Sequence, residues 1–325
     1  YGNVSYLVPN RFEDGYGLSP EVVDQAHARG AQMIMTVDNG ISSHAGVDHA
    51  HALGIPVLVT DHHLPGETLP AAEAIVNPNL RDCDFPSKSL AGVGVAFYLM
   101  LALRTFLRDK GWFEERGIAP PNLADLLDLV ALGTVADVVP LDANNRILTW
   151  QGLSRIRAGK CRPGIKALLE IANRDPQKLA ASDLGFALGP RLNAAGRMDT
   201  AAVALKLLLC ENEEQAAGIA ARLSEINTSR QQAEQQIAAA ALEKLSADPA
   251  RVLDRVIVVS GEGWHPGVIG IVATRLMEKY GRPSIVISTE NGEGRGSGRA
   301  PTSFNLHAAL CACAPLLLRF GGHSA

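Results

Sequence analysis

Two short apolar runs, each closed by acidic residues and one helix length apart, restrict the fold of this chain more than any other feature. The first run, residues 31–37, stops at Asp38, and the second, residues 55–59, stops at an Asp-His-His triplet at positions 61–63. The segment between them, residues 44–53, has the length and the closing glycine of a helix. A strand, a helix and a strand of this size form a right-handed crossover, so the two strands are predicted to be parallel neighbours.

Both predicted strands bring polar side chains to the same edge of the sheet. Asp38 follows one strand, and Asp61 and His62 follow the other. Parallel neighbours lie about 5 Å apart, so one divalent ion could contact groups from both strands. An isolated Asp-His-His turn more often caps a helix; the metal interpretation therefore depends on the two strands together.

A third carboxylate, Asp137, lies within the apolar sequence LVALGTVADVVPL, after a helix expected over residues 122–132. An unpaired buried charge is prohibitive, so Asp137 needs a cation. Either an arginine or a metal ion shared with Asp38 and His62 meets that need. Oxygen and nitrogen ligands without a thiolate suit Mn²⁺ or Mg²⁺.

Two glycine-rich stretches carry arginines that suit phosphate. Residues 185–197, GFALGPRLNAAGR, contain Arg191 and Asn193, and residues 292–299 read GEGRGSGR. We expect both to be loops, because glycine lets backbone approach a ligand and guanidinium groups match phosphate oxygens. The alternative for each is an ordinary surface loop. Together with a metal site, such loops predict metal-assisted hydrolysis of phosphoesters.

The domain organisation follows from one long helical pattern. Residues 213–245 contain no proline and repeat apolar residues at helical spacing, which predicts a helix about 45 Å long. Strand-like sequence resumes at residue 255. The predicted fold is α/β, with a parallel-sheet domain over residues 1–197, a connecting helical segment over 198–250 and a smaller α/β domain over 251–325.

Composition excludes some classes of protein. A net charge of −4 argues against a general basic surface that coats duplex nucleic acid, and 5% aromatic residues argue against a large base-stacking platform. No apolar run approaches the roughly 18 residues that span a bilayer. Five cysteines without a CxxC spacing indicate reduced thiols and a cytoplasmic setting.

Several motifs, in this order, give the chain a family resemblance. TVDNG at 36–40, VTDHH at 59–63, LGTVAD at 132–137, and the later GWHPGVIG and FGGHSA resemble the DHH phosphoesterase superfamily with its DHH-associated second domain. YLVPNRFEDGYG, GPRLNAAGRM and GSGRA are similar to its single-strand-specific 5′-to-3′ DNA exonucleases. The resemblance covers essentially the whole chain. It implies an active cleft between two domains and hydrolysis of single-stranded DNA in repair and recombination.

The resemblance also implies roles for the candidate metal site. It implies two ions, Mn²⁺ or Mg²⁺, in the intact protein, with Asp38 bridging them. His62 and Asp137 are implied as further metal ligands. Asp61 is implied to support His62, either as a further metal ligand or as a residue that holds His62 in place without contacting the ion. His63 is implied to contact the scissile phosphate.

Substrate contacts are implied from both halves of the chain. Arg191 or Asn193 is implied to stabilise charge on the scissile phosphate. The remaining implied contacts, three in a pocket for the 5′-phosphate and one in the groove of the second domain, are Arg11, Ser297, Arg299 and His323. The implied partners are single-stranded DNA with a 5′ end, a single-strand-binding protein and a RecQ-type helicase, with a monomeric enzyme and no membrane.

The chain departs from the family pattern at both ends. Family members carry an earlier D-x-D-G motif, which does not precede Tyr6, and a C-terminal segment with an oligonucleotide-binding fold, which is absent before Ala325. We therefore expect these 325 residues to hold at most one ion and to turn over poorly. Two alternatives stay open: a phosphoesterase for short oligoribonucleotides or cyclic dinucleotides, and a non-catalytic DNA-binding scaffold.

Overall fold

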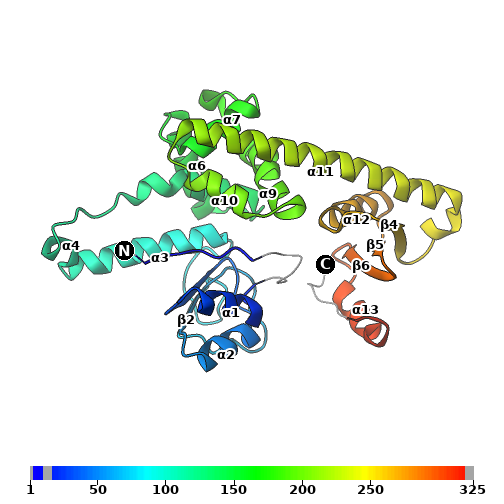
Figure 1. Ribbon diagram of the computed structural model, residues 1–325, viewed down its shortest axis with the longest axis horizontal. Helices are drawn as coiled ribbons and strands as arrows, with labels where there is room; N and C mark the ends of the chain where they lie inside the picture. The colour runs from blue at the N-terminus through cyan, green and yellow to red at the C-terminus, as the bar shows by residue number, and fades with distance from the viewer. Residues whose placement is uncertain (1–2, 10–16, 319–325) are drawn as a thin grey trace. The chain divides into compact units, whose positions relative to one another are not determined.

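The computed structural model describes residues 3–9 and 17–318, and the chain divides into two compact units. Unit 1 comprises residues 1–196 and 200–223, and unit 2 comprises residues 197–199 and 224–325. The predicted long helix is present as α11, Glu213–Ala247, which begins in unit 1 and ends in unit 2 (Figure 1). None of the helices among the described residues is long and apolar enough to cross a membrane.

Unit 1 contains the parallel sheet that the two apolar runs predict. Its strands are β1 (Ile34–Val37), β2 (Val57–Thr60) and β3 (Ala74–Val76), in the order β1-β2-β3. Both pairings are parallel, and Val37 lies opposite Thr60. The carboxyl ends of all three strands therefore meet at one edge, which confirms the crossover and positions the site described below.

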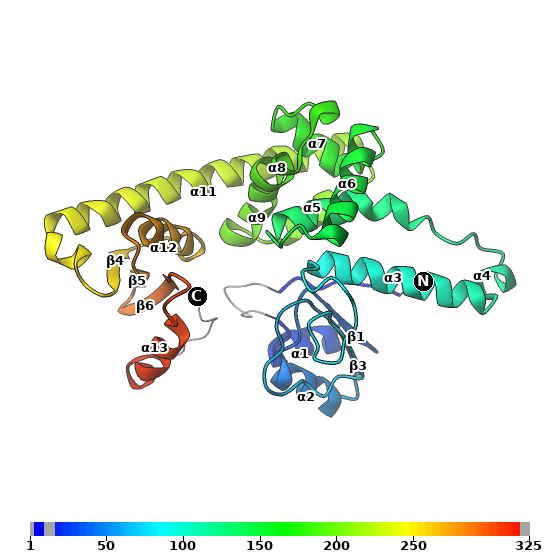
Figure 2. The same cartoon turned by 180° about the vertical axis from the view of Figure 1, so that it is seen from behind.

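Helices α1 (Pro20–Ala28) and α2 (His44–Ala52) pack on the sheet of unit 1 (Figures 1 and 2). The side chain of Ser19 accepts a hydrogen bond from the Val22 N–H, and a proline occupies the first helical position, which together start α1. The packing is apolar and dense, because the side chains at its centre are fully buried: Val23, Val47, Val57 and Val59.

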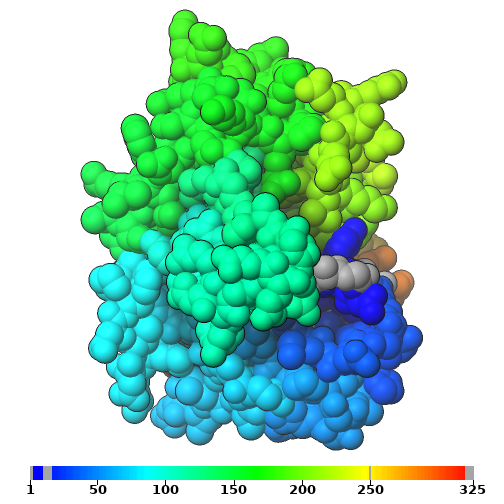
Figure 3. Space-filling view, turned by 90° about the vertical axis from the view of Figure 1, so that its left-hand side faces the viewer, coloured from blue at the N-terminus to red at the C-terminus, as the bar shows by residue number. Residues whose placement is uncertain are grey.

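Helix α3 (Gly92–Asp109) is buried only along its first half. In its second half, Leu103 is 49% exposed and Phe106 is 59% exposed. The short helix α4 (Trp112–Glu115) follows α3 and lies at the surface (Figure 3).

A helical cluster completes unit 1. Its buried apolar side chains come from α5 through α11 and form one core. The elements are η1 (Leu123–Leu126), α5 (Leu127–Ala136), α6 (Ala143–Arg157), α7 (Pro163–Ile171), η2 (Pro176–Lys178), α8 (Ala181–Asp183), the π-helix η3 (Leu184–Leu188), α9 (Gly189–Met198) and α10 (Ala202–Leu209).

Unit 2 is a small α/β unit built on one three-stranded sheet. Strand β4 (Ile257–Glu262) pairs parallel with β5 (Ser284–Glu290), and β5 pairs antiparallel with β6 (Glu293–Arg299). Helix α12 (Pro266–Tyr280) packs against this sheet. The remaining elements are η4 (Pro249–Val252), α13 (Leu306–Ala312) and η5 (Ala314–Leu316).

Residues 4–8 form no strand. Two local predictions were wrong. Residues 185–197 are helical in η3 and α9 rather than a loop, because their leucines and alanines are buried in the core of unit 1. Residues 293–299 are strand β6 rather than a loop: glycine alternates there with larger residues at the period of two that a strand requires.

Candidate metal site

The ends of the three parallel strands fix the backbone of the site. The Asp38 N–H donates to the Thr60 carbonyl at 3.0 Å, and the Asp61 N–H donates to the Val76 carbonyl at 3.1 Å. The buried Thr60 hydroxyl donates to the Thr36 carbonyl at 2.7 Å, which holds β1 and β2 together two residues before Asp38 and one residue before Asp61. Asp38 and Asp61 therefore start from a rigid edge.

His62 lies between two carboxylates that come from different elements. Its Nε2 lies 3.1 Å from Asp38 Oδ1, at the end of β1, and 3.4 Å from Asp137 Oδ2, the residue that ends α5. The ligand atoms of Asp38, His62 and His63 all lie within 4.8 Å of one another. The structure thus brings together all five residues that the sequence proposed for this site.

Asp61 holds the triplet in shape. It is 1% exposed; its Oδ2 accepts from the Ile41 N–H at 2.9 Å, and its Oδ1 accepts from the His62 N–H at 2.7 Å. Burial acts to raise the pKa of this carboxyl, but the bonds from the Ile41 N–H and from His63 outweigh burial and lower it. Asp61 is therefore an ionised acceptor, and His63 Nδ1, 2.6 Å away, donates to it. This bond fixes the tautomer of His63 and leaves Nε2 as the atom that can act on a ligand.

The electrostatics of His62 and Asp137 indicate a site that is short of positive charge. The Asp38 carboxylate raises the pKa of His62, while burial works in the opposite direction. Burial raises the pKa of Asp137, and the like charge of Asp38 adds to that rise. Two carboxylates converge on one imidazole, and the buried Nε2 of that imidazole makes no well-aligned hydrogen bond among the described residues. A divalent ion that prefers oxygen and nitrogen ligands fits this arrangement.

Two residues in the left-handed region of backbone space flank the site. Asp38 has a φ of 66° and Val138, which follows Asp137, has a φ of 59°. Aspartate tolerates this conformation, whereas a β-branched valine is an outlier that costs on the order of 1–3 kcal/mol. Both turns aim a carboxylate into the site, so the strain is located where the chain positions a ligand.

Gly92, the first residue of α3, permits the close approach of that helix to the site. A Cβ built on Gly92 would lie 2.2 Å from Asp38 Oδ1 and 2.6 Å from Asp38 Cβ. No other residue type leaves room for Asp38 in its observed position. Gly92 could not be recognised as part of the site from the sequence, because the contact is tertiary and no local pattern marks it.

Two asparagines that the sequence analysis did not assign to the site support the histidines. Asn77 Nδ2 donates to the His63 carbonyl at 2.9 Å, and Asn79 Nδ2 donates to the His62 carbonyl at 2.6 Å. Asn77 is 3% exposed. A signal was available in the sequence: Asn-Pro-Asn closes the third apolar run, and the end of β3 meets the same sheet edge.

The other predicted site residues are distributed over both units. Arg191 and Asn193 lie on α9, where Arg191 Nη1 donates to the Ala187 carbonyl at 2.6 Å. In unit 2, Arg299 Nη1 lies 3.3 Å from Ser297 Oγ on β6, so these two polar groups are together. The last two predicted residues lie outside the described residues: Arg11 and His323.

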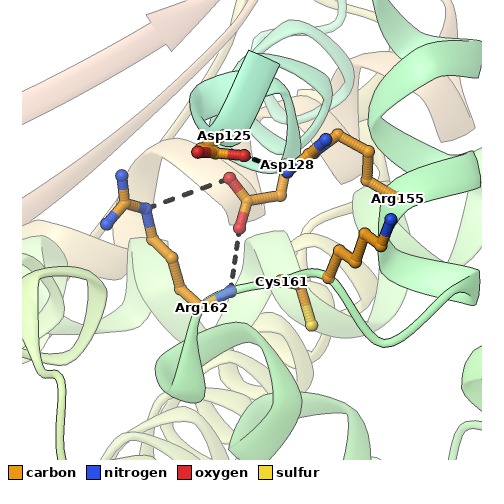
Figure 4. A pocket seen from close by; sticks show the side chains of 6 residues that line it. Asp125, Asp128, Arg155, Cys161 and Arg162 are labelled. Carbon is orange, nitrogen blue, oxygen red and sulfur yellow. Dashed lines mark hydrogen bonds and ion pairs between the residues drawn. The ribbon is translucent and has the colours of Figure 1, made fainter. Parts of the chain in front are cut away.

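A second hollow in unit 1, of about 420 Å³, lies at the opposite end of α5 from Asp137 (Figure 4). Asp128, in the first turn of α5, is 1% exposed and its Oδ2 accepts from the Arg162 N–H at 2.9 Å. Arg155 pairs with Asp125. At 1.5 Å per residue, Asp128 lies about 13 Å along the helix from Asp137. The Asp128–Arg162 bond joins α5 to the loop before α7, and the Arg155–Asp125 pair joins α6 to η1. The hollow is separate from the candidate metal site.

Comparison with known proteins agrees with this geometry. Residues 1–134 match the DHH family, N-terminal domain, and residues 253–325 match the DHHA1 domain. The chain is 68% identical to the single-stranded-DNA-specific exonuclease RecJ of Salmonella typhimurium over 330 residues, which covers 99% of this chain and 57% of that protein. The RecJ of Escherichia coli has the same identity and coverage. The chain thus spans little more than half the length of these relatives.

Solved structures give the same result. A crystal structure of exonuclease RecJ bound to manganese superposes with a TM-score of 0.81 at 36% identity, covering 98% of this chain and 75% of that one. RecJ of Thermus thermophilus in complex with Mn²⁺ gives a TM-score of 0.78 at 36% identity, covering 94% of this chain and 43% of that one. The chain therefore belongs to the DHH family, in its RecJ branch.

Proposed function

We propose that this chain carries the metal-holding and substrate-binding core of a 5′-to-3′ exonuclease that hydrolyses phosphodiester bonds of single-stranded DNA in repair and recombination. The observation that carries the proposal is the convergence of Asp38 and Asp137 on the buried Nε2 of His62. The names of the relatives and the manganese in the neighbouring structures support both the substrate and the ion. The activity belongs to residues 1–197 and 251–325 acting together.

In this proposal Asp38, His62 and Asp137 hold Mn²⁺ or Mg²⁺, with a second ion in the intact protein. A bound ion supplies Lewis-acid activation of water and neutralises charge on the phosphate. Asp61 keeps His63 in one tautomer, so the outer nitrogen of His63 faces the scissile phosphate. Arg191 or Asn193 stabilises the charge that develops there.

The polarity of the reaction rests on the proposed 5′-phosphate pocket. Ser297 and Arg299 present a hydroxyl and a guanidinium from one side of β6, which suits a terminal phosphate. The proposal also assigns substrate contacts to Arg11 and His323, which lie outside the described residues. A single-strand-binding protein and a RecQ-type helicase supply the substrate to a monomeric cytoplasmic enzyme, in keeping with five unpaired cysteines.

The test is hydrolysis of a 5′-phosphorylated, 3′-labelled single-stranded oligonucleotide in the presence of Mn²⁺. We expect mononucleotides to be released slowly from the 5′ end, and we expect Asp38→Ala or chelation of the metal to abolish release. A matched duplex and a dinucleotide serve as comparison substrates. Preferential cleavage of the dinucleotide would instead identify the chain as a phosphoesterase for short oligonucleotides. If Asp38→Ala hydrolysed the strand as well as the parent does, the assignment of the activity to the metal site would be refuted.

A further inference from the structure

Phe186 is the most exposed aromatic side chain among the described residues, at 86%. It lies in η3, the one-turn π-helix over Leu184–Leu188. Insertions of this kind are rare and occur frequently at functional sites. The neighbours of Phe186 within the turn, Ala187 and Leu188, are buried in the core of unit 1. The turn is therefore anchored by its neighbours while the phenyl ring is left in solvent.

The π-helix packs directly against the end of α5 that carries Asp137. A Cβ built on Gly185 would lie 3.2 Å from Val135 Cγ1, and one built on Gly189 would lie 3.5 Å from Ala136 Cβ. Residues on both sides of Phe186 thus contact the two residues that immediately precede Asp137. The turn that carries Phe186 is therefore packed against the end of α5 that leads into Asp137.

Arg191 fixes the same turn. Its Nη1 donates to the Ala187 carbonyl at 2.6 Å, one residue after Phe186. Its Nε is buried and has no hydrogen-bond partner among the described residues. The guanidinium of Arg191 is therefore bonded to the turn that carries the exposed ring, and cationic and aromatic side chains together bind the backbone and bases of a single strand.

A second apolar side chain is exposed at the residue that follows Asp137. Val138 is 86% exposed and is held in its strained conformation directly after the ligand. The valine side chain forms no hydrogen bonds, so its exposure to water does not stabilise the protein. Apolar groups at two positions that adjoin the same metal ligand suit the flat, apolar face of a nucleobase.

We propose that Phe186 stacks on a base of the single strand whose phosphodiester lies at the Asp38–His62–Asp137 cluster. This inference rests on the proposed function and adds a positioning residue to it. Every base has an aromatic face, so the contact orders the strand without reading its sequence. It also favours single strands, because bases in a duplex are already stacked and paired.

The test measures binding without turnover, using single-stranded oligonucleotides whose 5′-terminal linkages are phosphorothioates. Each oligonucleotide of the set carries one abasic nucleotide at a different position, and fluorescence anisotropy reports affinity in Mn²⁺. Stacking of one base on an aromatic side chain predicts that Phe186→Ala weakens binding by about 5- to 150-fold. Phe186→Trp should keep the affinity, and Phe106→Ala, which removes an exposed phenylalanine from α3, should leave it within about twofold.

The position of the abasic nucleotide decides the outcome. One oligonucleotide of the set lacks the base that stacks on Phe186. The parent protein should bind this oligonucleotide as weakly as Phe186→Ala does, so the two proteins should no longer differ in affinity for it. An equal loss at every abasic position, or no loss at all, would overturn the inference. Mn²⁺-dependent hydrolysis by the parent protein separates the two proposals. If the parent hydrolyses the strand and Phe186→Ala does not change the binding affinity, only the stacking role fails. If the parent neither binds the strand nor hydrolyses it, both fail.

Discussion

Replacing Gly92 with alanine tests how the fold positions Asp38. The added Cβ would lie 2.2 Å from Asp38 Oδ1 and 2.6 Å from Asp38 Cβ. Non-bonded carbon–oxygen and carbon–carbon contacts are normally about 3.3 and about 3.5 Å long, so one partner has to move by about 1 Å. Rotation of the Asp38 side chain can relieve the contact with Oδ1. It cannot relieve the contact with Cβ, which is fixed to the backbone of a residue already at a φ of 66°.

A displacement of about 1 Å is large for a metal ligand, since ligand distances are held within about 0.2 Å. We expect Gly92→Ala to weaken Mn²⁺ binding by about 10- to 100-fold, the range found when the supports of metal ligands are changed. We expect the free energy of unfolding to fall by about 1–3 kcal/mol, as for other overpacked sites. Isothermal titration with Mn²⁺ and urea denaturation measure the two effects.

Gly218→Ala is the matched control. Gly218 lies within α11, and a Cβ there would meet nothing within 4 Å. Helix propensity alone predicts that this change stabilises the chain by up to about 1 kcal/mol and leaves Mn²⁺ binding unchanged. If Gly92→Ala bound Mn²⁺ within twofold of the parent, the argument that α3 constrains Asp38 would be refuted.

Three further predictions concern groups around the site and in unit 2. The Asp38 carboxylate raises the pKa of His62, so protons compete with the ion and Mn²⁺ affinity should fall as the pH is lowered from about 8 to 6; a titration series that stays flat would contradict this. In the absence of metal, the contribution of His62 to the free energy of unfolding changes with pH in the opposite direction. This contribution is complete below the unfolded pKa of His62 and is lost as the pH rises through the raised folded pKa. Asn77→Ala should lower the free energy of unfolding by about 1–3 kcal/mol and weaken Mn²⁺ binding, since the His63 carbonyl loses its donor; thermal melts with and without Mn²⁺ measure both, and an unchanged pair of melts would count against the support role. Glu234 is 6% exposed and pairs with Arg230 at 2.6 Å, so Glu234→Ala should destabilise unit 2 by about 3 kcal/mol in urea denaturation, and a loss below about 1 kcal/mol would show that water replaces the pair.

The cluster of Asp38, His62 and Asp137 could be predicted from the sequence because its geometry follows largely from strand periodicity. The strand ends at Asp38 and at the triplet follow from two apolar runs and the handedness of a crossover. Asp137 could be placed because a carboxylate in an apolar sequence requires a partner. In each case a local pattern and one general rule were sufficient, and the structure brings these groups within contact distance.

The errors arose where tertiary packing overrides local composition. Glycine content suggested loops at residues 185–197 and 292–299, yet the first is helical and the second is largely strand β6. In β6 the glycines share one face, and a Cβ on Gly298 would lie 2.7 Å from Leu306 Cδ2. The glycines therefore permit close packing rather than a turn. Gly92 has the same role at the metal site, and only the folded structure reveals it.

Anomalous diffraction from crystals grown with Mn²⁺ tests the central claim most directly. The scattering of manganese locates the ion without reference to any assumed role of the side chains. We expect a peak within bonding distance of Asp38, His62 and Asp137, and we expect it to disappear in Asp38→Ala. A peak elsewhere in the chain, or an ordered site without any peak at saturating Mn²⁺, would contradict it.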